Sequence, residues 1–157
     1  MTRKLTQSDR RILRVLQAEG RISNVDLAAR VGMSPSPCLR RVRQLEADGI
    51  VTGYAATVDP RAVGLGVEAF IQVSIERHTD AEARTFRDAV AALPEVVACY
   101  IMAGEMDFLL RIMVADLDAY GRFALDRLMK IPGIKDVRSS FVLEVVKSAP
   151  EIPLSEV

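Results

Sequence analysis

The stretch SNVDLAARVGMSPSPCLRRVRQLEADGI, residues 23–50, holds two runs of helical periodicity separated by a glycine. A helix is expected to begin at Ser23, because Asp26 three residues later gives the pattern of a capping box. Gly32 stands where the end of that helix needs a residue with positive φ, and the next helix follows almost at once. Two short helices joined in this way are typical of a helix-turn-helix.

Two prolines, Pro35 and Pro37, precede the basic part of the second helix. Both are tolerated there, because the N–H groups in the first turn of a helix have no acceptor within the helix. Ser34 is the expected N-cap, and its hydroxyl can accept only from the N–H of Ser36, since Pro37 has none. The prolines therefore stiffen the end of the helix that precedes its arginines.

This helix has a polar side opposite an apolar side that comprises Cys38, Leu39, Val42 and Leu45. A recognition helix enters the DNA major groove by its N-terminal end, where arginine pairs with guanine or phosphate and glutamine with adenine. The N-terminus of the preceding helix suits a phosphate. The candidate DNA-binding residues are therefore Ser23, Asn24, Ser34, Ser36, Pro37, Arg40, Arg41, Arg43 and Gln44.

The charges are unevenly distributed along the chain, although their sum is zero. Residues 1–50 hold 10 lysines and arginines against 5 acidic residues, whereas residues 51–157 hold 11 against 16. A basic first part indicates contact with a polyanion, and it favours DNA over the plainer interpretation that the arginines form only a solvated helix face. No apolar run approaches the roughly 20 residues that span a membrane, so we expect a cytoplasmic protein without a membrane partner.

The pattern of the whole chain predicts an α+β fold with two parts. Before the helix-turn-helix, a first helix is expected from Thr6 or Ser8 to about Glu19, and Thr6 with Asp9 resembles a capping box at its start. After the helix-turn-helix, one or two wing-like strands are expected at 50–59. The second half has strand patterns at 67–76, 96–103, 108–115 and 137–146, with helices at 80–91 and after Asp116. This βαββαβ order predicts a ferredoxin-like domain. The predicted divisions are a helix-turn-helix domain with its linking strand at 1–59, a linker at 60–66, the βαββαβ domain at 67–147, and a loose or docking tail at 148–157.

The second half offers no convincing catalytic set. His78 is the single histidine and is expected in a solvated loop, and with only two cysteines a zinc site is not expected. We therefore predict no enzymatic activity, no metal and no cofactor. Glu105 and Asp107 lie in one turn, where they either keep a hairpin soluble or bind a small charged ligand. Ser139 and Ser140 are either exposed strand positions or hydroxyls that face a pocket.

Four stretches together resemble the Lrp/AsnC (feast/famine) family of transcription regulators: RISNVDLAARVGMSPSPCLRRVRQLEADGIVTGYAATVDP (21–60), LGVEAFIQVSIE (65–76), LPEVVACYIMAGEMDFLL (93–110) and IPGIKDVRSSFVLEVVK (131–147). The resemblance implies dimers that form through the sheets and assemble into tetramers or octameric rings. It also implies that amino acids bind between dimers, near the turn between the second and third strands. The effector-binding residues implied in this chain are Tyr100, Ala103, Gly104, Glu105, Met106, Asp107, Ser139 and Ser140.

The physical chemistry of this turn suits an amino acid. Gly104 permits positive φ and leaves a backbone N–H open to a carboxylate, and Asp107 can pair with an α-ammonium group. Met106 departs from the aromatic residue that the family often has before the aspartate, and methionine offers no stacking surface. The prediction is a homo-oligomeric, amino-acid-responsive transcription regulator that binds double-stranded DNA. The alternative is an architectural DNA-binding protein whose second half serves only for oligomerisation.

Overall fold

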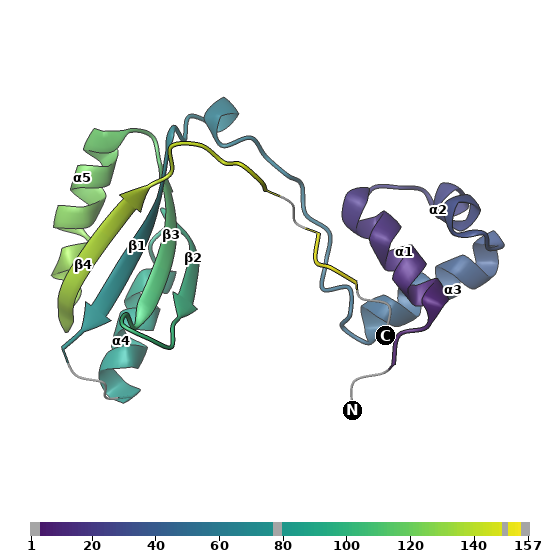
Figure 1. Cartoon of the computed structure of the whole chain (residues 1–157), viewed down its shortest axis with the longest axis horizontal. Coiled ribbons are helices and arrows are strands. Elements are labelled where there is room, and N and C mark those ends of the chain that lie inside the picture. The colour runs from purple at the N-terminus through teal and green to yellow at the C-terminus, as the bar shows by residue number, and fades with distance from the viewer. Residues whose placement is uncertain (1–3, 77–79, 149–150, 155–157) are drawn as a thin grey trace. The chain divides into compact units, whose positions relative to one another are not determined.

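The computed structural model describes residues 4–76, 80–148 and 151–154 (Figure 1). The chain divides into two compact units, one that ends at Thr57 and also includes the chain from Lys147, and one formed by Val58–Val146. The chain therefore passes between the units twice. His78, expected in a solvated loop, lies outside the described residues.

The first unit contains three helices, α1 (Gln7–Ala18), α2 (Asn24–Val31) and α3 (Pro35–Ala47). The expected N-terminal caps of α1 and α2 are present, since the side chains of Thr6 and Ser23 accept from the N–H groups of Asp9 and Asp26. Gly32 ends α2 in the left-handed conformation at φ 69°. The helices bury a small core of Ile12, Leu13, Leu27, Ala28, Val31, Cys38 and Leu45.

Three details of the first unit differ from the sequence-based prediction. The Ser34 side chain makes no capping hydrogen bond, because Pro35 and Pro37 leave so few N–H groups in the first turn of α3. Leu39, expected on the apolar side of α3, is 36% exposed. Residues 50–59 contain no strand, because no described segment of this chain pairs with them and an isolated strand leaves its backbone groups unpaired.

The side chain of Tyr54 attaches the segment after α3 to the rest of the first unit. Its hydroxyl donates to Oε1 of Glu46 (3.0 Å), and its ring lies 3.4 Å from where a Cβ on Gly20 would stand. Burial of the phenol, its hydrogen bond to Glu46 and the negative charge of that carboxylate raise the pKa of Tyr54 to about 12. The uncharged phenol is thus favoured in the folded state.

We expect this hydrogen bond to be lost in strongly alkaline solution. Because the folded pKa lies above the unfolded value of about 10, its contribution to stability is complete below pH ~10 and is lost as the pH rises towards 12. In Glu46→Gln the pKa of Tyr54 should fall but stay above 10, since the burial remains. An NMR titration of the Tyr54 ring measures both values, and an unchanged pKa in Glu46→Gln would show that the carboxylate has no part in the shift.

The second unit has the predicted βαββαβ order. Its elements are β1 (Val67–Ile75), α4 (Asp80–Ala91), β2 (Val96–Ile101), β3 (Phe108–Val114), α5 (Leu117–Asp126) and β4 (Ile134–Phe141), with short 3-10 helices at Arg61–Val63 and Leu128–Lys130. The described strands form one antiparallel sheet in the order β2-β3-β1-β4. Figure 1 shows α4 and α5 on the same face of this sheet.

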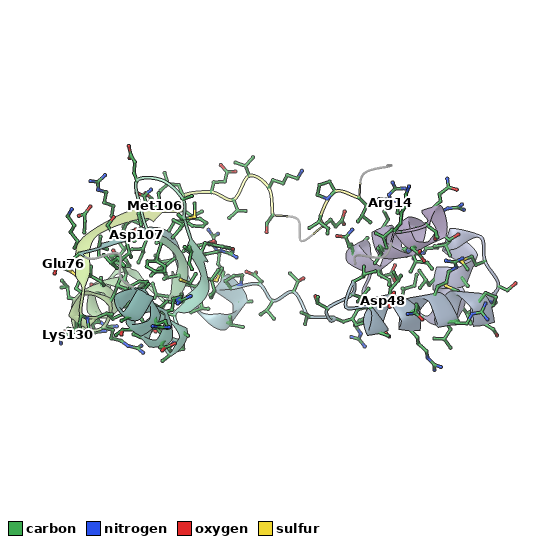
Figure 2. All side chains as sticks on the ribbon, turned by 90° about the horizontal axis from the view of Figure 1, so that it is seen from below. Arg14, Asp48, Glu76, Met106, Asp107 and Lys130 are labelled. Atoms are coloured by element: carbon green, nitrogen blue, oxygen red, sulfur yellow. The ribbon has the colours of Figure 1, made fainter. Side chains whose placement is uncertain are left out.

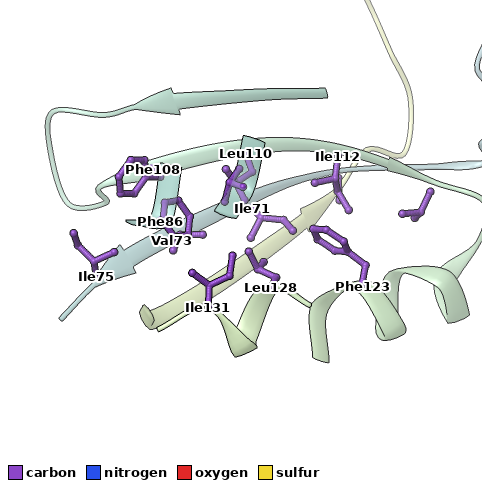
Figure 3. Close-up of a cluster of buried hydrophobic side chains, with 13 residues drawn as sticks. Ile71, Val73, Ile75, Phe86, Phe108, Leu110, Ile112, Phe123, Leu128 and Ile131 are labelled. Carbon is purple, nitrogen blue, oxygen red and sulfur yellow. The ribbon is translucent and has the colours of Figure 1, made fainter. Parts of the chain in front are cut away.

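Alternation of side chains along the two central strands builds the core of this unit. In β1 and β3 every second residue is buried against the helices, and Figure 3 shows these side chains meeting Phe86, Phe123, Leu128 and Ile131. The edge strand β4 ends earlier than predicted, at Phe141 opposite Ala69, because β1 itself begins only two residues before Ala69. Leu143 and Val146, predicted within the strand, are consequently more than 90% exposed.

Two glycines of this unit should respond to alanine with opposite signs. A Cβ on Gly66 would lie 2.8 Å from the carbonyl oxygen of Ala115, a backbone atom that cannot turn away, whereas a Cβ on Gly121 within α5 meets nothing within 4 Å. Gly66→Ala is therefore expected to lower the free energy of unfolding by about 1–3 kcal/mol. Gly121→Ala is expected to raise it by about 0.5–1 kcal/mol, because alanine is the better helix former. Urea unfolding compares the two; the same sign for both would contradict the prediction.

Candidate functional site

The solvent-facing side of α3 presents the basic candidates of the first unit. Ser36, Arg40 and Arg43 are exposed, whereas Cys38 and Leu45 on the opposite side are fully buried. Within the described part of the chain, neither Arg40 nor Arg43 makes a hydrogen bond or an ion pair with another residue. Ser34 and Pro37 are also exposed, at the N-terminal end of the same helix. These side chains are open to a polyanion.

Arg41 belongs to the interior contacts of the unit. Its Nη1 donates to Oδ1 of Asp9 (3.0 Å) and to the hydroxyl of Thr6 (3.2 Å). Asp9 is completely buried, and its other oxygen accepts from both the N–H (2.9 Å) and the hydroxyl (2.6 Å) of Thr6. Arg41 therefore joins α3 to the N-terminus of α1 and provides the charge that a buried carboxylate needs.

Three further candidates have hydrogen-bond partners within the unit. Asn24 Nδ2 donates to the carbonyl of Pro35 (2.9 Å), so it links the start of α2 to the start of α3. Ser23 is bonded to Asp26 through its hydroxyl (2.6 Å), and Gln44 Nε2 donates to Oδ1 of Asp48 (2.7 Å). The Asn24 contact joins the two helices, and those of Ser23 and Gln44 each stay within one helix, whereas Ser34, Ser36, Pro37, Arg40 and Arg43 remain the open part of the candidate set.

The turn between β2 and β3 is fastened to the end of β1. Met102 N–H donates to the carbonyl of Asp107 (2.9 Å), and Asp107 N–H donates to the carbonyl of Val73 (3.1 Å). The carboxylate Oδ2 of Asp107 accepts from the N–H of Ile75 (2.8 Å). Gly104 has φ 144°, a value that side chains disfavour, as expected from the sequence. Figure 2 shows where Met106 and Asp107 lie on this unit.

The remaining effector candidates do not gather around this turn within one chain. Tyr100 is half-exposed on β2 of the same hairpin, but β1 separates the hairpin from Ser139 and Ser140 on β4. These serines lie on opposite faces of the sheet, because they are consecutive in a strand. Ser139 faces the helices, where its oxygen accepts from the hydroxyl of Tyr120 (2.5 Å), and Ser140 is exposed.

The sequence-based prediction missed one polar contact on α1. Asp9 was assigned only to a cap, although its spacing to Ile12, Leu13 and Leu16 places it on the apolar face of α1, and that spacing is the signal that indicates a buried carboxylate. Its partner Arg41 could not be recognised from the sequence, because ion pairs between distant residues leave no local pattern.

Across residues 4–76, 80–148 and 151–154, no group of three histidine, cysteine or acidic residues is placed to hold a metal ion. The same residues include no helix that is long and apolar enough to cross a membrane.

Comparison with known proteins assigns both units. A model described as winged helix-turn-helix DNA-binding matches residues 5–52, and the model of the Lrp/AsnC ligand binding domain matches residues 68–152. The chain is 39% identical over 145 residues to the leucine-responsive regulatory protein of Escherichia coli (strain K12), covering 92% of this chain and 88% of that protein.

Solved structures agree with these matches. A transcriptional regulator of Neisseria meningitidis, solved as a complex with L-methionine, is 45% identical with a TM-score of 0.92 over 96% of this chain and 97% of that chain. An AsnC family transcriptional regulator of Agrobacterium tumefaciens is 38% identical with a TM-score of 0.90 over 95% and 97%. A feast or famine regulatory protein of M. tuberculosis complexed with L-methionine is 32% identical with a TM-score of 0.82 over 95% and 99%.

Proposed function

This chain belongs to the Lrp/AsnC family of DNA-binding transcription regulators, and from that premise we propose how its two units act. The first unit binds specific sites in double-stranded DNA through α3, and the second binds an amino acid that changes this binding. The observation that carries the proposal is the exposed side of α3, where Arg40 and Arg43 have no partner among the described residues. A protein with these properties acts in the cytoplasm, where chromosomal DNA lies.

The candidate residues divide by their surroundings into contacting and positioning groups. Arg40 and Arg43 contact guanine edges or phosphates. Ser36 and Pro37 have small side chains in the first turn of α3, so this end of the helix can approach the groove closely. Ser34 and the α2 N-terminus at Ser23 and Asn24 approach a phosphate. Arg41 acts by holding α3 against α1, since it is paired with Asp9, whereas Gln44 bonds Asp48 at the C-terminal end of the same helix.

Footprinting on the DNA upstream of the protein's own gene tests the proposed function. We expect protected sites that recur at about one helical turn or a multiple of it, because a dimer presents two recognition helices to successive major grooves. A panel of the amino acids added during footprinting should change the protection for at least one of them. Protection that is uniform along the DNA and indifferent to the whole panel would instead support the architectural alternative.

The proposed effector is an apolar L-amino acid, with L-methionine and L-leucine as the first candidates. Two similar structures are L-methionine complexes, and the curated relatives carry the name leucine-responsive regulatory protein. The backbone N–H groups at Gly104 and Glu105 are suited to a carboxylate, and the apolar side chains at Tyr100, Ala103 and Met106 are suited to an aliphatic side chain. The L-methionine complexes of relatives also favour a responsive regulator over a purely architectural protein.

Asp107 has two parts in this proposal. Its Oδ2 holds the N–H of Ile75 and so fixes the turn, while the carboxylate as a whole supplies the negative charge for an α-ammonium group. Ser139 and Ser140 lie beyond β1 from this turn, so they contribute only if another subunit brings its own β4 to the site. We therefore propose that the site is completed between subunits of a homo-oligomer, built from dimers as a tetramer or octamer.

A ligand that completes such a site acts by favouring one arrangement of subunits. It shifts the equilibrium only as far as its affinities for the two arrangements differ. An amino acid held between dimers would therefore change their assembly and, through it, the spacing of the helix-turn-helix units on DNA.

Gly104→Val should weaken effector binding at least about tenfold, because valine strongly disfavours φ 144° and the N–H groups of the turn would point elsewhere. The protein should still fold, since a Cβ at Gly104 meets no atom within 4 Å. Ala92→Val adds a branched side chain at an exposed position after α4 and is the matched control. Isothermal titration with L-methionine and L-leucine measures the affinity; equal affinities in the wild type and Gly104→Val would place the site elsewhere.

A further inference from the structure

The last described residues of the chain lie against α1 of the first unit. Gln17 Nε2 donates to the carbonyl of Ile152 (3.3 Å), and the N–H of Ile152 donates to Gln17 Oε1 (2.7 Å). One turn earlier on α1, Arg14 Nη2 donates to the carbonyl of Leu154 (3.3 Å). These contacts join residues that are more than 130 positions apart in the sequence. The tail was expected to be either loose or docked, and the contacts favour docking.

The first unit contacts Ile152 through its backbone and Leu154 also through its side chain. The Gln17 amide bonds both backbone groups of Ile152, as a neighbouring strand would, while the Ile152 side chain is 66% exposed. The Leu154 side chain packs against the apolar core of the first unit. Pro153 has a fixed φ and holds the residue before it in an extended conformation, so the segment is already shaped for docking.

The geometry points to α1, at Arg14 and Gln17, as a docking surface whose partner is the chain's own segment 152–154, and we propose that this docking links the two units a second time. The chain leaves the first unit after Thr57 and returns to it at Lys147. The two connecting segments meet the second unit at neighbouring strand ends, because Ala69 near the start of β1 pairs with Phe141 at the end of β4. A change at the end of β4 is thereby transmitted to α1, independently of the segment that follows α3.

Amide hydrogen exchange in the full chain tests the docking itself. The N–H of residue 152 reports on the docking, because it donates to Gln17. The next residue, Pro153, has no N–H to exchange. Gln17→Ala and Leu154→Ala should each speed its exchange at least about tenfold, because either change releases the segment. Two controls should leave it unchanged: Gln7→Ala, whose amide oxygen accepts from Arg11 on the same helix, and Ile152→Ala, which removes an exposed side chain. Exchange in the wild type at the rate of an unstructured peptide would overturn the proposal.

A shortened chain that ends at Ser148 gives a second measurement. A synthetic peptide of residues 147–157 should bind this shortened chain, and it should bind the same chain with Gln17→Ala at least about tenfold more weakly. Absence of binding to the shortened chain would count against a docking surface on α1.

The expected effect of the link on DNA rests on the proposed function. Loss of the segment should lower affinity for the footprinted DNA about three- to tenfold, because the first unit is then less restricted before it binds. Unchanged DNA affinity would refute the coupling between the units. Failure of the wild type itself to bind DNA would refute the proposed function alone, since the exchange experiment measures docking without DNA.

Discussion

Arg40→Ala is expected to lower affinity for the specific DNA site about 5- to 150-fold, the effect of losing about 1–3 kcal/mol of contact to a base edge or phosphate. The fold should be unaffected, because Arg40 is exposed and has no partner among the described residues. Fluorescence anisotropy with the footprinted DNA, repeated at several salt concentrations, measures the loss. If Arg40 holds a phosphate, the slope of log K against log salt should also fall by about one unit.

Two other arginines give this experiment its controls. Arg87→Ala removes the same charge from an exposed position of α4 in the second unit, and it should leave DNA affinity nearly unchanged. Arg43→Ala, one turn from Arg40 on the same side of α3, should resemble Arg40→Ala. Equal affinities of the wild type and both α3 variants at every salt concentration would refute the assignment of this helix face to DNA.

Local signals explain why much of the fold could be predicted. The Ser23 cap and Gly32 define the ends of α2 within a few residues, and the alternation of apolar residues identifies β1 and β3. The wing-like strands at 50–59 and the extension of β4 to residue 146 were predicted from β-branched residues alone. A strand also needs a partner, and propensity carries no information on whether one is present.

The candidate site was predicted less completely for a related reason. The positive φ of Gly104 is a property of one residue, whereas the attachment of Asp107 to Ile75 depends on where two strands meet. Ser139 and Ser140 were considered together because they are adjacent in the sequence, but adjacent strand residues face opposite ways. Arg41 was expected on a flank of α3 but was still grouped with the DNA-binding candidates, and only the position of α1 shows that it pairs with Asp9.

Asp9→Ala is expected to lower the free energy of unfolding of the first unit by about 2–4 kcal/mol, the largest effect on stability that we predict for this unit. Among the described residues, the change removes the acceptor of three hydrogen bonds, two from Thr6 and one from Arg41, and it takes away the buried partner of a cationic side chain. The effect should fall short of that for a fully buried pair, because the Arg41 side chain is 36% exposed and can still reach water. Urea unfolding followed by the helical circular dichroism signal measures it.

Asp26→Ala is the matched control, since Asp26 occupies the same position in α2 that Asp9 occupies in α1 and likewise accepts from the hydroxyl of its own cap residue, Ser23. Asp26 is exposed, so its removal should lower the free energy of unfolding by only about 0.5–1 kcal/mol. A double-mutant cycle then isolates the ion pair: Asp9→Ala and Arg41→Ala together should destabilise the unit by less than the sum of the single changes. Equal losses for Asp9→Ala and Asp26→Ala, with additive effects in the cycle, would show that burial of Asp9 adds nothing to an ordinary cap and that Arg41 is free to contact DNA.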